Sequence, residues 1–345
     1  MADLPDELKQ PYVGGDVEPV ALEIPETDIS WVRQRAHVRA TLEDLMGDIP
    51  ARPDPVRAEV VASEPRDGYT LERVLIDNGA GVNMPGYVLI PDGRTQPGPA
   101  IVFNHYHGGQ YDLGKDELFM DDWPVDGTTL ADELIRQGYV VLAIDSYAFG
   151  ERRCHGPAGT AEEGTPTEWS LYKLFAWQGK NMWGMMVRDD RIALDYLVTR
   201  SEVDPERIGA MGMSMGSTRT WWLAAMDERV KASACIACLT HYQTLIANGK
   251  VGAHGIYYYV PGMLRHFDSE AVLALIAPRA LITLTGADDG GSPAEGVRIL
   301  NEACEQVYAL YGKSDHFRGL LYEGVGHTYT PEIWREVSEW FERWL

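Results

Sequence analysis

The amino-acid sequence predicts an α/β protein with a mostly parallel central sheet and helices on both faces of that sheet. Three observations support this prediction. From Ala100 onward, short runs that are apolar throughout alternate with runs of helical periodicity. Strands without a polar face are typical of parallel sheets that helices cover on both sides. The chain of 345 residues, 45% of them hydrophobic, is long enough to bury a large core without disulfide or metal cross-links.

The first part of the chain is expected to form a helical extension. Apolar residues recur at helical spacing over residues 31–46, and the proline-rich run 49–55 ends this pattern. We therefore divide the chain into an N-terminal helical extension, residues 1–60, and a main domain, residues 61–345. The extension's helix fits two arrangements equally well, packed on its own domain or on a second subunit of a homo-oligomer.

The main domain is expected to start with an antiparallel hairpin and to continue as the parallel sheet. The β-rich runs 70–76 and 87–90 predict the hairpin. The expected strands that follow are residues 101–103, 139–144, 208–211, 232–239, 280–284 and 319–322, and the expected helices are residues 130–137, 182–198, 217–226 and 332–345.

One connection is much longer than the others. Roughly 40 residues separate strand 232–239 from strand 280–284, and this insert, about residues 240–276, contains three consecutive tyrosines from Tyr257 and a helix over residues 269–276. Long insertions above the carboxyl edge of a sheet usually form lids or pocket walls. The alternative is a surface excursion that is packed by its own aromatic side chains.

The composition argues against several classes of partner. Acidic residues outnumber basic residues by 52 to 30, which gives a formal net charge of −22. Such a surface repels phosphate backbones and anionic lipids, so we expect neither nucleic-acid binding nor membrane binding.

The first residues lack a basic and apolar leader, and no run approaches the roughly 18 apolar residues of a membrane span, so a cytoplasmic protein is expected. Cys235 and Cys238 have redox spacing but fall in an apolar run, which indicates core cysteines.

The sharpest motif is Gly212-Met213-Ser214-Met215-Gly216, which stands between an expected strand and an expected helix. A nucleophile elbow needs this arrangement, because the tight strand-to-helix turn exposes the serine hydroxyl. Larger side chains at the two glycines would clash with the neighbouring backbone. We therefore predict that Ser214 is a nucleophile.

A serine nucleophile needs a base that takes its proton. In a fold of this kind the base is a histidine that comes last along the chain. His327 directly follows an expected strand, whereas His316 precedes that strand and so belongs to the opposite edge of the sheet. His327 is the predicted base.

The base needs an orienting carboxylate, expected on the loop after strand 280–284. This loop holds two acids, Asp288 and Asp289. The spacing of Asp289 from Gly286 and Pro293 lets the loop turn back toward the histidine, which favours Asp289. Asp288 remains the alternative.

Acyl transfer also needs N–H donors for the developing oxyanion. One should be the amide of Met215, the residue after the nucleophile. The second should come from the loop after strand 101–103, and it is the amide of His107 or that of Gly109, depending on where the strand ends. His105 and His107 lack a third metal ligand at suitable spacing, so we expect no metal.

Several aromatic and basic side chains are candidates for a substrate pocket. Loop 145–153 follows the carboxyl end of a strand, and its Arg152 or Arg153 could bind a substrate carboxylate. An ion pair on the acidic surface is the commoner role for such an arginine. The aromatic candidates, which are often plain core residues, are Tyr106, Tyr147, Trp183 and the three tyrosines Tyr257, Tyr258 and Tyr259, with Tyr258 as the representative of the three.

Residues 203–216, which contain the elbow, resemble the corresponding segment of α/β-hydrolases and, more narrowly, of the dienelactone-hydrolase-like and acetyl-xylan-esterase-like branch. Ala277-Pro278-Arg279-Ala280-Leu281 and Gly324-Val325-Gly326-His327 are similar to that branch as well. The resemblance covers about residues 65–345. It implies that the main domain is an α/β-hydrolase catalytic domain with a lid-like insertion, and that it hydrolyses esters through an acyl-enzyme without a cofactor.

One departure from the branch bears on the substrate. Dienelactone hydrolases proper use a cysteine nucleophile, whereas this chain has Ser214, which favours a carboxylic ester over a dienelactone. Acetyl-xylan esterases are often exported, so the lack of a leader favours a small, soluble ester over a polymer. Two alternatives remain: a serine peptidase of the prolyl-oligopeptidase type, and a non-catalytic binding protein that retains the fold.

Overall fold

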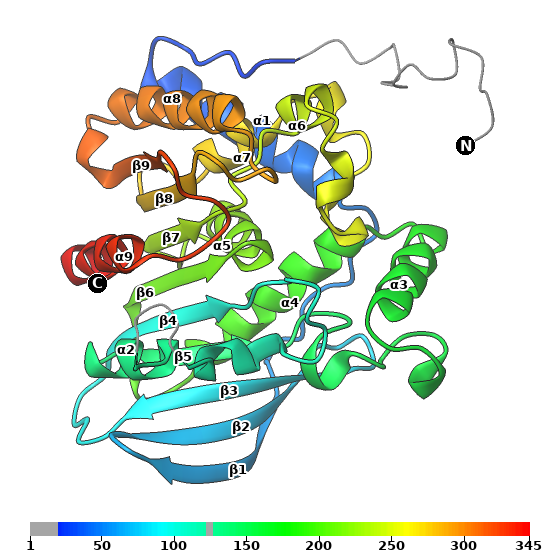
Figure 1. The fold of residues 1–345 in the computed structure, drawn as a ribbon, viewed down its shortest axis with the longest axis vertical. Helices are drawn as coiled ribbons and strands as arrows, with labels where there is room; N and C mark the ends of the chain where they lie inside the picture. Colours follow the sequence, from blue (N-terminus) through cyan, green and yellow to red (C-terminus); the bar gives the residue numbers. More distant parts are fainter. Residues whose placement is uncertain (1–19, 122–126) are drawn as a thin grey trace.

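The sheet is the scaffold of the molecule. The computed structural model describes residues 20–121 and 127–345, so the first 19 residues of the predicted extension lie outside the described part. In this part nine strands form one sheet, in the order β1-β2-β3-β5-β4-β6-β7-β8-β9 (Figure 1). The pairings from β1 through β3 to β5 are antiparallel, and all those from β5 to β9 are parallel. The strands are β1 (Ala58–Arg66), β2 (Tyr69–Asp77), β3 (Asn83–Pro91), β4 (Gly98–Asn104), β5 (Val140–Ile144), β6 (Val203–Met213), β7 (Ala232–Ile236), β8 (Ala280–Gly286) and β9 (Phe317–Tyr322).

Helices cover both faces of the sheet (Figure 1). One face packs against α1, α4, α5, α7 and α8, and the other packs against α2 and α9. The helices are α1 (Asp28–Leu45), α2 (Leu130–Arg136), α3 (Thr165–Trp177), α4 (Met182–Leu197), α5 (Met215–Met226), α6 (Tyr242–Ala247), α7 (Ser269–Ala274), α8 (Ala294–Leu310) and α9 (Pro331–Trp344). Short 3₁₀ helices are η2 (Gly114–Phe119), η3 (Gly150–Arg152), η4 (Gly159–Ala161), η5 (Val251–Ala253), η6 (Ile256–Tyr258), η7 (Met263–Arg265) and η8 (Ser314–His316).

The core consists of two layers, one on each face of the sheet. Alternate side chains of a strand point to opposite faces. In β4, Val102 therefore joins the larger core with α4 and α5, while Ile101 and Phe103 join the smaller core with α2 and α9. All three side chains are buried, which explains the apolar run that predicts a parallel strand.

The predicted α/β fold with a mostly parallel sheet is confirmed, and each expected strand and helix of the main domain overlaps an observed element of the same type. Among the strands and α-helices of the described residues, four were not predicted, namely β1, α3, α6 and α8. In β1 nearly every residue is exposed, so its sequence lacks the alternation that a half-buried strand shows. The strand predicted over residues 232–239 ends at Ile236, since Ala237 and Cys238 adopt left-handed φ angles of 56° and 47°.

The insert after β7 folds against the helices at one side of the sheet. It contains α6, the 3₁₀ helices η5 to η7, and α7. In it, η6 contacts α3 and α4, while α7 contacts α1, α5 and α8. The insert is therefore packed on the rest of the domain on several sides. Among the described residues, none of the helices has both the length and the apolar character needed to cross a bilayer.

Candidate active site

Ser214 lies at the sharp turn between β6 and α5. Its φ of 58° and ψ of −121° are costly for a residue with a side chain, and such strain persists only where the surrounding structure holds it. Close packing of backbone explains the flanking glycines. A Cβ atom on Gly212 would lie 2.3 Å from the carbonyl oxygen of Asn104, and one on Gly216 would lie 1.9 Å from the same oxygen. The turn therefore has the geometry that the sequence motif predicts.

Replacement of Gly216 by alanine is expected to lower the free energy of unfolding by about 3 kcal/mol, because β4 and α5 would have to move apart. Urea unfolding measures this change. Gly252→Ala is the matched control, since a Cβ atom there meets nothing within 4 Å and its φ is ordinary. A Gly216→Ala protein as stable as the control would contradict the close approach of β4 to the elbow.

His327 and Asp289 come from the loops that follow β9 and β8. The Nδ1 atom of His327 lies 2.7 Å from Oδ2 of Asp289, and Oδ1 of Asp289 accepts a hydrogen bond of 2.9 Å from the amide of Gly291. Burial of Asp289 by itself raises the pKa of its carboxyl, but the hydrogen bond and charge of His327 outweigh this effect, and the net pKa is lowered. Asp289 is thus held as a carboxylate beside the imidazole. Asp288 is exposed.

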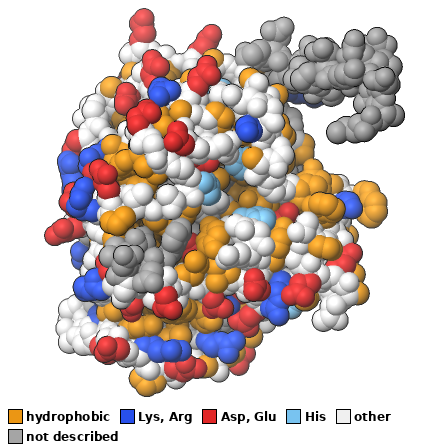
Figure 2. All heavy atoms as spheres, viewed as in Figure 1, with side chains coloured by type: hydrophobic (Ala, Val, Ile, Leu, Met, Phe, Trp, Pro, Cys, Tyr) orange, Lys and Arg blue, Asp and Glu red, His pale blue; other side chains and the backbone are white. Residues whose placement is uncertain are grey.

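One cavity of about 510 Å³ brings these groups together. Ser214, Asp289 and His327 all line it, but no hydrogen bond joins the Ser214 hydroxyl to His327, and the nearest partner of that hydroxyl is Cys238 Sγ at 3.7 Å. Such bonds are often long before substrate binds. Figure 2 shows histidine side chains in the middle of this face of the molecule. The other residues that line the cavity are His107, Gly108, Gly109, Ala253, His254, Gly255, Tyr257, Gly290 and Gly291.

The loop after β4 forms another wall of this cavity. The amide of Gly109 donates to Nδ1 of His107 at 3.0 Å, so Nε2 of His107 carries the ring proton and faces Glu168 Oε2 at 3.3 Å. The Gly109 amide is therefore engaged within its own loop. The amide of Met215 lies in the first turn of α5, where a helix provides no acceptor. This arrangement favours His107 over Gly109 as the second oxyanion donor.

Two side chains of the cavity were missed by sequence reasoning, namely Cys238 and His254, whereas Tyr257 was among the tyrosines expected to line the pocket. Cys238 was assigned to the core as part of a strand. It is indeed buried, and this burial raises the pKa of its thiol to about 12, but the chain turns after Ile236 and places the sulfur beside Ser214. Its position just past the carboxyl end of β7, the neighbour of the elbow strand, was the available indication.

His254 connects the insert to the loop that carries Asp289. Its Nε2 atom donates to the carbonyl of Gly291 at 2.8 Å, and Thr240 Oγ1 donates to the same carbonyl at 3.1 Å. The His254 ring stacks on Tyr258 with 4.6 Å between ring centroids. Burial lowers the pKa of His254, so the ring stays neutral near pH 7. The insert therefore lines the cavity and also holds its acid loop.

The predicted pocket residues outside this set lie elsewhere. Arg152 is fully buried, pairs with Asp189 at 2.9 Å and stacks on the Tyr147 ring, so its guanidinium is an internal ion pair and does not reach the cavity. Arg153 pairs with Glu163 at 2.7 Å on the surface. Five aromatic candidates do not line the cavity, namely Tyr106, Tyr147, Trp183, Tyr258 and Tyr259. The hydroxyl of Tyr106 donates to Gln110, and Trp183 is buried against Trp222 and Tyr257. Tyr258 stacks on the ring of His254.

A mostly parallel sheet with a serine at a strained strand-to-helix turn, and with acid and histidine loops after the later strands, defines the α/β-hydrolase superfamily. The family model described as the Abhydrolase family matches residues 20–309, and the chain belongs to this family. A protein of Bacillus subtilis (strain 168) named "Putative hydrolase YtaP" is 39% identical over 311 residues, which cover 90% of this chain and 100% of that protein.

Solved structures share the fold at low sequence identity. The crystal structure of a "putative acetyl xylan esterase" from Bacteroides fragilis is 19% identical, with a TM-score of 0.73 over 95% of this chain and 92% of that one. A glucuronoyl esterase from Solibacter usitatus is also 19% identical, with a TM-score of 0.65 over 95% of this chain and 99% of that one. Both likenesses extend over almost the whole chain.

Proposed function

We propose that the protein is a serine hydrolase that cleaves a carboxylic ester of a small, soluble substrate through an acyl-enzyme intermediate. The observation that carries this proposal is the cavity that Ser214 shares with the hydrogen-bonded pair of His327 and Asp289. The likeness to structures described as acetyl xylan and glucuronoyl esterases supports an ester as the substrate. The volume of about 510 Å³ suits a small acyl or alcohol group.

In the proposed reaction, the Oγ atom of Ser214 attacks the ester carbonyl while Nε2 of His327 takes its proton. Asp289 accepts the Nδ1–H of His327, which fixes the tautomer and stabilises the imidazolium that forms. The amides of Met215 and His107 stabilise the oxyanion of the tetrahedral intermediate.

The second half of the reaction repeats these roles. The imidazolium of His327 protonates the leaving alcohol, so that the acyl group stays on Ser214. Water then attacks this acyl-enzyme as His327 takes its proton. Collapse of the second tetrahedral intermediate returns the proton to Ser214 and releases the acid.

A fluorophosphonate probe tests this proposal. We expect one equivalent of probe to label the wild-type protein and Ser201→Ala, an exposed-serine control, but not Ser214→Ala, as measured by intact-mass spectrometry. Short-chain p-nitrophenyl esters and aminoacyl amides, assayed in parallel, separate an esterase from a peptidase. Failure of folded wild-type protein to react with the probe would refute the serine-hydrolase proposal and favour a binding protein.

A further inference from the structure

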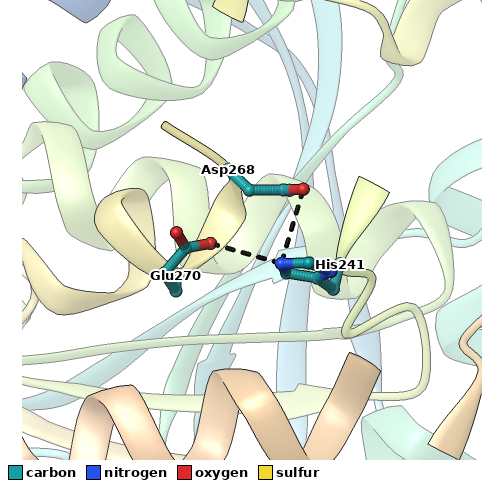
Figure 3. A group of neighbouring side chains, drawn as sticks. All are labelled: His241, Asp268 and Glu270. Atoms are coloured by element: carbon teal, nitrogen blue, oxygen red, sulfur yellow. Dashed lines mark ion pairs between the residues drawn. The ribbon is translucent and has the colours of Figure 1, made fainter. Parts of the chain in front are cut away.

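A second group of polar side chains lies outside the cavity of Ser214. It consists of His241, which caps α6, Asp268, which caps α7, and Glu270 in the first turn of α7. We call these three residues the His241 cluster. Figure 3 shows His241 Nε2 facing one carboxylate oxygen of each acid. Asp268 is 0% exposed and Glu270 is 3% exposed, so both carboxylates are buried.

The spacing of the potential ligand atoms suits a small metal ion. His241 Nε2 lies 3.5 Å from Asp268 Oδ2 and 3.8 Å from Glu270 Oε2, and all three atoms lie within 4.8 Å of one another. Tetrahedral coordination with metal–ligand bonds of about 2.1 Å places ligand atoms about 3.4 Å apart. Small side-chain movements would therefore bring all three atoms to coordination distance.

Glu270 gives a second, independent indication. Its Oε1 atom accepts a hydrogen bond of 3.1 Å from the amide of Leu22, but its buried Oε2 atom accepts none from any residue in the described part of the chain. A buried carboxylate oxygen that accepts no hydrogen bond is costly. This oxygen faces His241 Nε2, and a cation between the two atoms would bind both of them (Figure 3).

The charge around the cluster is also unbalanced. In the described residues, the ion-pair partner of both Asp268 and Glu270 is His241, and neither acid pairs with a lysine or arginine. A cavity of about 510 Å³ next to the cluster is lined by further acids, Glu295 and Glu302, and by no basic residue other than His241. A cation could enter from this cavity and would neutralise buried negative charge.

The surroundings hold the potential ligands in place. Both oxygens of Asp268 accept backbone amides, from Tyr242 and Ser269 at Oδ1 and from Gln243 at Oδ2. His241 Nδ1 accepts the backbone amide of Thr244 at 3.3 Å, which caps α6, and also lies 2.7 Å from Thr244 Oγ1. An imidazole that binds a metal through Nε2 would give up the longer of these bonds and donate its Nδ1–H to Thr244 Oγ1. Such partners orient metal ligands and strengthen binding.

We propose that His241, Asp268 and Glu270 bind a divalent cation of the zinc class. The imidazole nitrogen favours Zn²⁺ or Co²⁺ over Mg²⁺ or Ca²⁺, which prefer oxygen ligands alone. The ion would join α6, α7 and the segment at Leu22, so its role is to fasten the insert and the N-terminal segment together. The cavity next to the cluster shares no lining residue with the cavity of Ser214, so the ion is separate from the proposed ester hydrolysis.

Zn²⁺ and Co²⁺ titrations of the full-length, chelator-treated protein test this site. Glu270→Gln keeps an oxygen for the Leu22 amide and removes the charge, and His241→Gln removes the nitrogen ligand. Glu302→Gln is the matched control, because this exposed acid lines the same cavity outside the cluster. We expect one tightly bound ion in the wild type and in the control, and about tenfold or greater weakening in each cluster variant.

Two further readouts make the result decisive. Bound Co²⁺ should give the visible absorption of a four- or five-coordinate site in the wild type, and Zn²⁺ should raise the melting temperature of the wild type but not of Glu270→Gln. Circular dichroism establishes that each variant is folded, and Glu270→Gln suffices if His241→Gln does not fold. The proposal is overturned if the wild type binds no ion, or if folded Glu270→Gln binds the ion as tightly as the wild type.

Discussion

Replacement of Ser214 by alanine is expected to lower kcat for ester hydrolysis by about 10⁶-fold, the scale at which loss of the nucleophile removes the whole covalent pathway. Ser214 lies at the elbow turn and lines the cavity that holds His327, and alanine at this position removes only the hydroxyl. Active-site concentration and initial rates on the best ester of the substrate panel measure the effect. The exposed-serine variant Ser201→Ala should keep the wild-type kcat.

Cys238 is a neighbouring group that could complicate this result, because its sulfur lies 3.7 Å from Ser214 Oγ. Burial raises the pKa of the thiol to about 12, so little thiolate is present near pH 7 and we expect no substitute nucleophile. Retention of more than about a hundredth of the wild-type kcat in Ser214→Ala would contradict the assignment of Ser214. If Cys238→Ala then abolished that remaining activity, the nucleophile would be Cys238.

Replacement of Asp289 by asparagine is expected to lower kcat by about 10⁴-fold. The carboxylate accepts the Nδ1–H of His327 at 2.7 Å, whereas an amide at this position can donate to Nδ1 and so stabilise the wrong tautomer of the base. Steady-state kinetics over a range of pH measures the change in kcat. Asp288→Asn is the matched control, because this neighbouring acid is exposed and should leave kcat close to that of the wild type.

The comparison of the two variants also decides between the two acids that sequence analysis left open. Equal losses of kcat in Asp288→Asn and Asp289→Asn would mean that activity depends on the conformation of the loop and not on one particular carboxylate. A larger loss in Asp288→Asn would exclude Asp289 as the acid. Circular dichroism of both variants guards against a loss that reflects unfolding.

The groups most readily predicted from the sequence are those whose position follows from local chain geometry. Ser214 directly follows β6 and His327 stands on the loop after β9, and parallel strands bring such loops to one edge of the sheet. The order of the strands across the sheet depends on long-range pairing, which local sequence patterns do not reveal. Whether Asp288 or Asp289 faces His327 depends on how the loop after β8 turns. The tertiary structure places Asp289, and not Asp288, in contact with His327.

The positions of the pocket residues follow from the sequence less readily than those of Ser214, Asp289 and His327, and for a physical reason. Arg152 follows a strand of the sheet as a pocket residue should, but a buried partner far away in the sequence, Asp189, binds its guanidinium. His254 stands in the insert, where periodicity gives no information about which residues return to the sheet. Cys238 was masked by its apolar neighbours, because nothing local shows that the chain leaves the strand two residues earlier.

The two hydrogen bonds that the insert makes to the carbonyl of Gly291 have a consequence for engineering. Thr240 and His254 both belong to the insert, while Gly291 belongs to the loop that holds Asp289. The insert therefore cannot be exchanged as an independent module, because a graft that replaces all of it would release the acid loop together with the old pocket wall. A graft confined to residues 255–266 would keep both anchors, so that part of the cavity wall can be redesigned without loosening the loop of Asp289.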